Sequence, residues 1–307
     1  MPKNCKKTIC FIHYGIGWRD GVNMVIKTLV NGIQKQNSHL NFCFIGGKIK
    51  ERFLKNADYK EIPELLPEKE YPNKKSIEKK GLSIAKKIAQ ATKGITVIVI
   101  ENPFIGEYHL PAMLGFSIYA AQFKPPGTKV FFRIHDLYTD NPHYCDESLK
   151  FFSSSEIKNI IKGRGVDGFF VVNHNLEKKL IKEGISQKKV FYLSNGVDEE
   201  KFNKRLKSGE VSAIYASLGI SNKDTKILLY PVRVVPRKNI EEAILLAYYI
   251  RKITSENYIL VISGKIDKYD SLSCGYYKIL EKIISAVNFP VIFTKKPLPL
   301  ERSYNSL

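Results

Sequence analysis

The stretch that decides the fold is TICFIHYGIGWRDGVNMVIKTLVNGI, which occupies residues 8–33. It opens with an apolar run typical of a buried strand and continues through a glycine-rich turn at residues 15–21. It ends in a segment whose apolar side chains recur at helical spacing. Strand, glycine turn and helix in this order form the opening unit of an α/β fold with a parallel sheet.

Most of the chain repeats this alternation. The apolar runs are rich in β-branched residues and show no polar alternation, which is typical of parallel strands covered on both faces. The segments between them have apolar residues three or four positions apart and predict helices. A doubly wound, mainly parallel sheet follows. The expected strands are 8–14, 41–45, 95–100, 129–134, 168–172 and 190–193, and the later helices are 74–92, 108–122, 148–162 and 174–183.

A change in composition divides the chain. Residues 199–225 are polar and rich in lysine, with one short helical pattern at 212–218, and we expect a linker there. Residues 1–198 would form a first Rossmann-like domain and residues 226–307 a second. The second has strand patterns at 226–231, 258–263 and 290–293 and helical patterns at 239–254 and 273–287. Rossmann-type sheets usually have five or six strands, so we expect an α/β fold with two Rossmann-like domains, the second incomplete.

The charge of the chain is its compositional outlier. The 307 residues include 49 Lys and Arg against 30 Asp and Glu, a net charge of +19. Such a charge attracts phosphate-bearing ligands, nucleic acid or anionic membranes, although a coding bias toward lysine would give the same composition. The sequence has no RNP-type aromatic segment, zinc finger or clear helix-turn-helix, so we expect no nucleic-acid partner.

Cysteine usage and hydropathy indicate a cytoplasmic protein. The five cysteines form no C-x-x-C pair and predict reduced thiols and no metal site. No apolar run approaches the ~20 residues that cross a bilayer. Six lysines lie on the amphipathic helix expected at 74–92, which leaves peripheral contact with the inner membrane face as an alternative to an ordinary solvated surface.

The glycine-rich turn is a candidate phosphate site. Gly17 and Gly21 lie between a strand and a helix, where backbone N–H groups can approach an anion. A merely tight turn is the alternative interpretation. The third glycine of a dinucleotide fingerprint would fall on Asp20, and the second strand ends without an acidic residue for a ribose. These two features argue against an oxidoreductase.

Two further segments carry candidate functional residues. Arg133-Ile134-His135-Asp136 ends a buried strand, at the edge where open α/β sheets bind ligands. His135 can donate to a sugar hydroxyl or act as a base, or the His–Asp pair merely caps the next loop. Arg233 and Lys238 flank the start of the expected helix at 239–254, where two cations and a helix N-terminus can clamp a diphosphate. A solvated basic turn is the alternative for that segment.

Several motifs together resemble one family. The segment 194–198 with Phe202 resembles the exit from the first domain of retaining glycosyltransferases with GT-B architecture, family four of that class. Residues 231–239 resemble the donor-diphosphate motif of these enzymes, and residues 15–23 and 133–138 also fit the family. The similarity covers most of the chain and is nearest to members that glycosylate small compounds such as glucosylglycerate. Each motif is weak alone, but their order and intervals are specific.

The resemblance implies a sugar transfer from a nucleotide diphosphate sugar to a hydroxyl acceptor, with retention and no cofactor or metal. The acceptor would be a small polar compound, a lipid or a glycan. Arg233, Lys238, Gly17 and Gly21 would hold the donor diphosphate. His135 would contact the donor sugar as a catalytic residue with Asp136, and Glu101 and Asn102 would face the acceptor.

One departure from the family pattern bears on activity. The later family motif of two glutamates seven residues apart is absent, since Glu301 is the only glutamate after residue 293. We therefore expect a sequence that ends before the donor subsite is complete, with a separate chain as one way to supply the missing segment. The alternatives are a non-catalytic remnant and a module that binds an anionic membrane surface.

Overall fold

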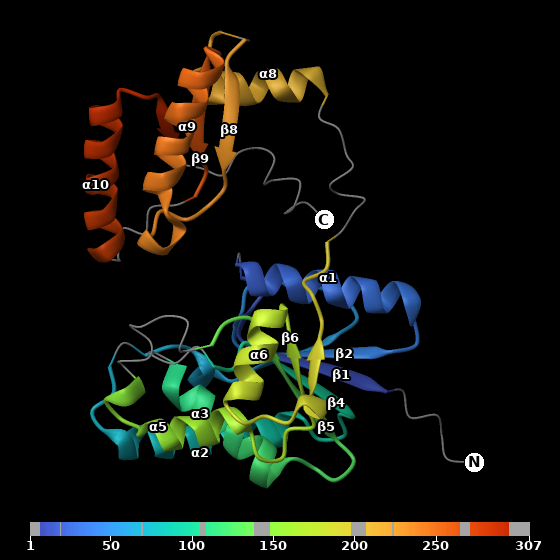
Figure 1. The fold of residues 1–307 in the computed structure, drawn as a ribbon. Helices are drawn as coiled ribbons and strands as arrows, with labels where there is room; N and C mark the ends of the chain where they lie inside the picture. Colours follow the sequence, from blue (N-terminus) through green and yellow to red (C-terminus); the bar gives the residue numbers. More distant parts are fainter. Residues whose placement is uncertain are drawn as a thin grey trace. The chain divides into compact units, whose positions relative to one another are not determined.

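The computed structural model describes most of the chain, which divides into two compact units, Met1–Val197 and Asp198–Leu307 (Figure 1). The described residues are 7–18, 20–68, 70–104, 109–137, 148–197, 207–222, 224–264 and 271–294, with the side chains of 271–274 excepted.

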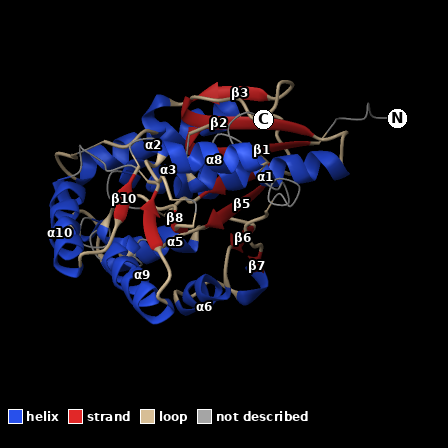
Figure 2. Ribbon diagram, turned by 90° about the horizontal axis from the view of Figure 1, so that it is seen from above, coloured by secondary structure: helices blue, strands red, loops and turns tan. Residues whose placement is uncertain are grey.

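Unit 1 is built on a seven-stranded sheet in the order β3-β2-β1-β4-β5-β6-β7. Every neighbouring pair is parallel. The chain starts in the middle of the sheet, and the strand order reverses direction between β1 and β4, as in doubly wound folds. The strands are β1 (Thr8–Ile16), β2 (Asn41–Ile49), β3 (Asp58–Glu61), β4 (Val97–Glu101), β5 (Lys129–Ile134), β6 (Gly168–Val171) and β7 (Val190–Tyr192). Figure 2 shows β1, β2 and β3 side by side.

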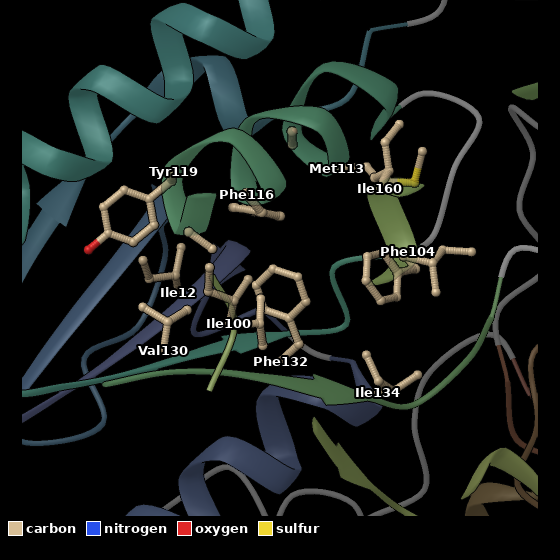
Figure 3. Close-up of a cluster of buried hydrophobic side chains, with 14 of the residues drawn as sticks. Ile12, Ile100, Phe104, Met113, Phe116, Tyr119, Val130, Phe132, Ile134 and Ile160 are labelled. Carbon is tan, nitrogen blue, oxygen red and sulfur yellow. The ribbon is translucent and has the colours of Figure 1, made fainter. Parts of the chain in front are cut away.

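Helices cover the two faces of this sheet unequally. The larger core lies on the face covered by α2 (Lys74–Ala91), α3 (Leu110–Ile118), α5 (Ser154–Lys162) and α6 (His174–Lys182). In this core Phe116 of α3 faces Ile100 and Phe132 of the sheet (Figure 3). The other face packs against α1 (Gly21–Gln36) through Ile26 and Val30. Short helical turns complete the unit at η1 (Pro63–Leu65), η3 (Tyr119–Phe123) and η5 (Gln187–Lys189).

The lysine-rich helix α2 is part of the first core. Its buried residues, among them Ile77, Ile84 and Ile88, pack inside unit 1. Three of its six lysines form ion pairs: Lys74 with Glu156, Lys80 with Glu68, and Lys87 with Glu64. Because the apolar face is buried, only the lysine face remains for contact with a membrane. Within the described residues, no helix has both the length and the hydropathy that crossing a bilayer requires.

Unit 2 contains a three-stranded parallel sheet in the order β10-β9-β8. Its strands are β8 (Lys226–Tyr230), β9 (Tyr258–Ile262) and β10 (Val291–Phe293). The helices α9 (Ile240–Thr254) and α10 (Ser271–Val287) pack on one face, and α8 (Ser208–Ser217) packs on the other. A 3₁₀ turn, η6 (Pro236–Lys238), connects β8 to α9. The expected fold class is confirmed: an α/β fold of two Rossmann-like units, the second with fewer strands.

Some elements differ from the sequence expectation. Strand β3 was not predicted, and the helix expected at 108–122 ends in the π-helical turn η3 after residue 118. Helix α8 lies inside the stretch expected to be a linker, and starts four residues before the helical pattern noted there. The start of that expected linker, residues 199–206, lies outside the described residues, as do Tyr138, Asp198, Phe202 and Glu301 of the sequence motifs.

Candidate active site

Three ionisable side chains meet where β4 and β5 end. Glu101 is the last residue of β4 and lies opposite Arg133 in the parallel register, and His135 follows β5 directly. Oε2 of Glu101 is 2.8 Å from Nε2 of His135, and its Oε1 is 3.6 Å from Nη1 of Arg133. The Glu101 side chain is 0% exposed and that of Arg133 1%, so both charges are removed from water.

The contact with Glu101 determines how the imidazole of His135 is oriented. A carboxylate only accepts hydrogen bonds, so Nε2 of His135 carries the hydrogen and donates it to Glu101. That leaves Nδ1 as the second polar atom of the ring. Buried charges persist when they are paired, and Arg133 provides the compensating positive charge for Glu101. The cluster therefore holds one imidazole in a defined orientation at the carboxyl edge of the sheet.

Asn102 holds the backbone that carries His135. Its own backbone lies in the left-handed region, with φ of 50°, and its N–H donates to the carbonyl oxygen of Arg133 at 2.7 Å. Its Oδ1 accepts from the backbone N–H groups of His135 at 3.3 Å and Asp136 at 3.2 Å. Asn102 is itself buried, whereas Asp136 is exposed. The acceptor-side role suggested by the sequence for Glu101 and Asn102 stays a prediction; in the structure both residues position the 135–136 loop.

Arg133 also brings two of the sequence motifs together. Its Nη2 donates to the backbone oxygen of Ser194 at 3.4 Å and to Oδ1 of Asn195 at 3.3 Å. The segment after β7 thus contacts the segment after β5. Within the described part of the chain, Nε and Nη1 of Arg133 and Oε1 of Glu101 are buried without a hydrogen-bond partner. Nη1 of Arg133 and Oε1 of Glu101 face each other at 3.6 Å as an ion pair, so their charges compensate each other inside the protein.

Two more histidines lie near the cluster. Burial lowers the pKa of His13, and it outweighs the opposite effects of the hydrogen bond with Gly15 and of the carboxylates of Asp20 and Glu101. Burial also lowers the pKa of His109, to about 3, with a smaller contribution from His13. The His109 ring lies against the ring of Tyr14, with 3.8 Å between the ring centroids and the two planes tilted by 41°. These contacts place His109 in the packed interior of unit 1.

The glycine loop is ordered by its own side chains. Oδ1 of Asn23 accepts from the N–H of Gly17 at 2.8 Å, and Asp20 caps α1 by accepting from the N–H of Asn23 at 2.8 Å. A Cβ atom on Gly17 would lie 2.1 Å from the backbone oxygen of Glu51, so this residue must be glycine for steric reasons. A Cβ on Gly21 would meet nothing within 4 Å. Phosphate binding by Gly17 and Gly21 stays a prediction, and the Gly17 N–H already has an internal partner.

The remaining predicted residues lie in unit 2. Arg233 and Lys238 both belong to the connection between the carboxyl end of β8 and the start of α9. Arg233 is exposed and Lys238 is half-buried, with its backbone oxygen accepting from Tyr230 Oη at 2.6 Å. The connection is closely packed, since a Cβ on Gly264 would lie 1.8 Å from the backbone oxygen of Val232. Both cations are thus placed at the carboxyl edge of the second sheet.

Sequence reasoning missed the roles of Arg133 and Asn23. Arg133 was part of a noted motif, and a charged residue inside an apolar strand was the signal that it required a buried partner. Asn23 lies three residues after the helix cap at Asp20, within reach of the turn that it orders. Among the described residues, no group of three or more His, Cys, Asp and Glu side chains is arranged to hold a metal ion.

Comparison with known proteins identifies the fold. No protein-family model matches the sequence, and no curated protein matches it by sequence. A glycosyltransferase from Rickettsia africae ESF-5 is similar with a TM-score of 0.61 at 12% identity, over 97% of this chain and 71% of that chain. HepE of Anabaena, solved with UDP and glucose, gives 0.58 at 14% identity, over 94% of this chain and 68% of that chain.

A third similar structure is that of an epimerase and not of a glycosyltransferase. The UDP-GlcNAc 2-epimerase of Neisseria meningitidis, bound to UDP-GlcNAc, gives a TM-score of 0.52 at 13% identity, over 97% of this chain and 74% of that chain. Identities this low establish a shared fold and not a shared reaction. The chain therefore has a GT-B glycosyltransferase-like fold, and its chemistry has to be argued from its own residues.

Proposed function

We propose that this protein is a glycosyltransferase that moves a sugar from a nucleotide diphosphate sugar to a hydroxyl acceptor with retention of configuration. The observation that carries the proposal is the Glu101–His135–Arg133 cluster at the carboxyl edge of the first sheet. Ligands of open α/β sheets bind at this edge, beside the point where the strand order reverses. Similarly folded proteins were solved with UDP, UDP-glucose or UDP-GlcNAc, which supports a nucleotide sugar as the ligand.

His135 is the residue that would contact the donor sugar. With Nε2 directed to Glu101, Nδ1 is the atom left to hydrogen-bond a sugar hydroxyl. Glu101 is fully buried and acts through His135, so we assign it a positioning role. Asp136 is exposed and presents a carboxylate that can accept a hydrogen bond from the acceptor hydroxyl.

Arg233 and Lys238 would bind the diphosphate of the donor. Two cations at the end of a parallel strand offset the negative charge that grows on the departing diphosphate, which lowers the barrier for cleavage of the glycosidic bond. The first turn of α9 contains Glu241 and Glu242, which disfavour an anion at that helix terminus by itself. Binding would therefore depend on the two cationic side chains.

Isothermal titration tests the donor site. The purified chain is titrated with UDP-glucose, GDP-mannose and the free diphosphates, and we expect saturable binding of at least one of them. Arg233→Ala and Lys238→Ala should each weaken it by about tenfold or more, because each removes a charge-assisted contact. Lys282→Ala, which removes an exposed lysine of α10, is the matched control and should bind normally. A folded chain that binds none of these ligands contradicts the proposal.

Product analysis separates sugar transfer from epimerisation. The chain is incubated with the donor that binds, with glycerate and related hydroxyl acceptors, and the products are identified by mass spectrometry and NMR. Transfer should give an acceptor–sugar conjugate of retained anomeric configuration, and His135→Ala should lower its rate by about 10²-fold. An isomerised nucleotide sugar without any conjugate would indicate an epimerase instead.

A further inference from the structure

His13 is a second histidine at the carboxyl edge of the first sheet. It follows the register pair Ile12–Ile100 of β1 and β4, so the parallel register places it beside Glu101. Side chains alternate along a strand, and Ile12 and Ile100 lie in the core under α2 and α3, so His13 and Glu101 are on the other face. The strand order reverses between β1 and β4, and open α/β sheets bind ligands at such a point.

The hydrogen bonds of His13 determine which ring nitrogen carries its hydrogen. Nδ1 is 2.8 Å from the backbone oxygen of Gly15, which can only accept, so Nδ1 carries the hydrogen and Nε2 is an acceptor. Burial lowers the pKa of His13, which favours this ring with a single hydrogen. Within the described residues, Nε2 has no hydrogen-bond partner and is not among the buried atoms that lack one. It therefore belongs to the 7% of His13 that solvent reaches.

The backbone around His13 is already hydrogen-bonded. The Gly15 oxygen accepts from Nδ1 of His13 and from Nδ2 of Asn23 at 3.0 Å, which uses both of its lone pairs. The N–H of Gly17 donates to Oδ1 of Asn23 at 2.8 Å. A ligand beside these residues would therefore meet Nε2 of His13 rather than these backbone groups.

The surroundings of Nε2 disfavour an anion. The ionisable groups that act on the pKa of His13 are Asp20, Glu101 and His135, two of which are carboxylates. Arg133 is 1% exposed and is paired with Glu101. A carboxylate or phosphate oxygen at Nε2 would face a lone pair as well as these negative charges, whereas a hydroxyl can donate its hydrogen to the lone pair.

We propose that His13 determines acceptor specificity, with Nε2 accepting a hydrogen bond from a second hydroxyl of the acceptor, so that the substrate class is an uncharged polyol. This inference rests on the proposed function, which makes the edge of this sheet an acceptor site. Asp136 would accept from the hydroxyl that receives the sugar, and His13 from one that does not react. A site built to bind a hydroxyl rejects analogues that lack it, because its own polar group is left unpaired.

Matched acceptors test the chemical class. Sugar transfer is measured with glycerol against glycerate and with glucose against glucuronate, because in each pair a carboxylate replaces a CH₂OH group. We expect kcat/KM to be at least about tenfold higher for the neutral member of each pair. Equal values, or a preference for the carboxylates, would overturn this inference and leave the proposed sugar transfer intact.

Two substitutions separate a contact with the acceptor from packing of the loop. His13→Asn keeps an N–H near the position of Nδ1, which can donate to Gly15, and removes Nε2. His13→Gln keeps an acceptor near the position of Nε2 and loses the bond with Gly15. We expect His13→Asn to raise the KM for the neutral acceptor by about tenfold or more with unchanged donor affinity, and His13→Gln to keep KM within about threefold of the wild type. The reverse order would make His13 only an anchor of the glycine loop.

Trp18 provides a readout that needs no turnover. A Cβ atom on Gly15 would overlap its indole, so the single tryptophan of the chain packs against the residue that His13 binds. Titration of the full chain with glucose should change the fluorescence saturably, glucuronate should need at least about tenfold higher concentrations, and His13→Asn should weaken the response to glucose.

The outcomes of this titration distinguish the two proposals. A response to glucose that His13→Asn leaves unchanged would overturn the role of His13. A response that depends on His13 in a chain that transfers no sugar would overturn the proposed function and leave the polyol subsite. Neither a response nor transfer would overturn both.

Discussion

Glu101 carries a charge that water does not reach, and two partners hold it in place. Replacement by glutamine keeps the size of the side chain and an oxygen that can accept from His135, but removes the negative charge beside Arg133. We expect Glu101→Gln to lower the free energy of unfolding by about 3 kcal/mol, because an uncompensated buried guanidinium remains. Urea unfolding followed by circular dichroism measures the change.

A second substitution separates the two consequences of this change. In the Glu101→Gln background, Arg133→Met removes the unpaired charge and should restore most of the lost stability. Sugar transfer should stay low in the double variant, since His135 has lost its charged partner. Recovery of both stability and activity would mean that the Glu101–Arg133 pair is only structural.

The buried histidines make stability depend on pH. The pKa of His109 is lowered to about 3 by burial and by His13, and the pKa of His13 is lowered as well. Both rings therefore take up a proton less readily in the folded chain than in the unfolded chain, where a histidine is protonated below about pH 6.5. The free energy of unfolding should therefore fall as pH decreases from 6.5, by at most about 1.4 kcal/mol per pH unit for each histidine.

Urea titrations check this dependence. They compare the wild type with His109→Gln at about pH 7.5, 6 and 5. The variant should lose less stability on acidification than the wild type, because one of the two histidines with a lowered pKa is gone. An equal pH dependence in both proteins would show that His109 takes up its proton without cost in the folded state.

For single residues, the sequence predicted positions along the strands better than it predicted contacts between side chains. His135 could be placed at the carboxyl edge because the apolar run before it ends so clearly at Ile134. Its partner is 34 positions away in the sequence, and only the register between β4 and β5 brings the two together. The acceptor-side role of Glu101 came from the family resemblance and stays a prediction, and the structure adds its buried contact with His135.

At the scale of elements, the carboxylate of Asp167 connects the start of β6 to β5 through hydrogen bonds. It accepts from Lys124 Nζ and from the Val130 N–H, both at 2.9 Å, and from Lys129 Nζ at 2.9 Å. Burial acts to raise the pKa of Asp167, but these hydrogen bonds outweigh it and lower the pKa to about 2. The contribution of this carboxylate to stability is therefore present above about pH 4 and is lost as the pH falls through about 2.

Substitution of this residue tests the connection between the two strands. Asp167→Asn should lower the free energy of unfolding at pH 7 by about 2 kcal/mol, since it weakens three hydrogen bonds to one charged group. Asp224→Asn, at an exposed aspartate of unit 2, should change it by no more than about 0.5 kcal/mol. Similar urea midpoints for the two variants would contradict a role for Asp167 in joining β5 and β6.

Elements with a strong apolar pattern were predicted well, and the weakly patterned ones were not. The central strands of unit 1 are continuous runs of buried residues, so their positions follow from hydrophobicity alone. Strand β3 has the sequence DYKE and pairs only with β2 at the edge of the sheet. Short, charged strands are typical of protected edges and leave no apolar signal to detect.

For the molecule as a whole, each unit has its own hydrophobic core. In unit 1, helices pack on both faces of a seven-stranded sheet. In unit 2, the described sheet has three strands, and large apolar side chains such as Leu246 and Ile253 stay exposed. The alternation of strands and helices predicted two Rossmann-like α/β parts, the second with fewer strands.

Separate cores of unequal size predict unfolding in two steps. The single tryptophan, Trp18, lies in unit 1, where its Nε1 donates to the backbone oxygen of Lys48 at 3.3 Å. Tryptophan fluorescence therefore reports on unit 1, whereas far-UV circular dichroism reports on both units. In urea we expect the dichroism to change first, at a midpoint about 1 M below that of the fluorescence, because the smaller core of unit 2 is less stable.

Residues 1–197 expressed alone should reproduce the fluorescence midpoint. Coincident transitions in the full chain would show instead that the two units unfold as one cooperative body.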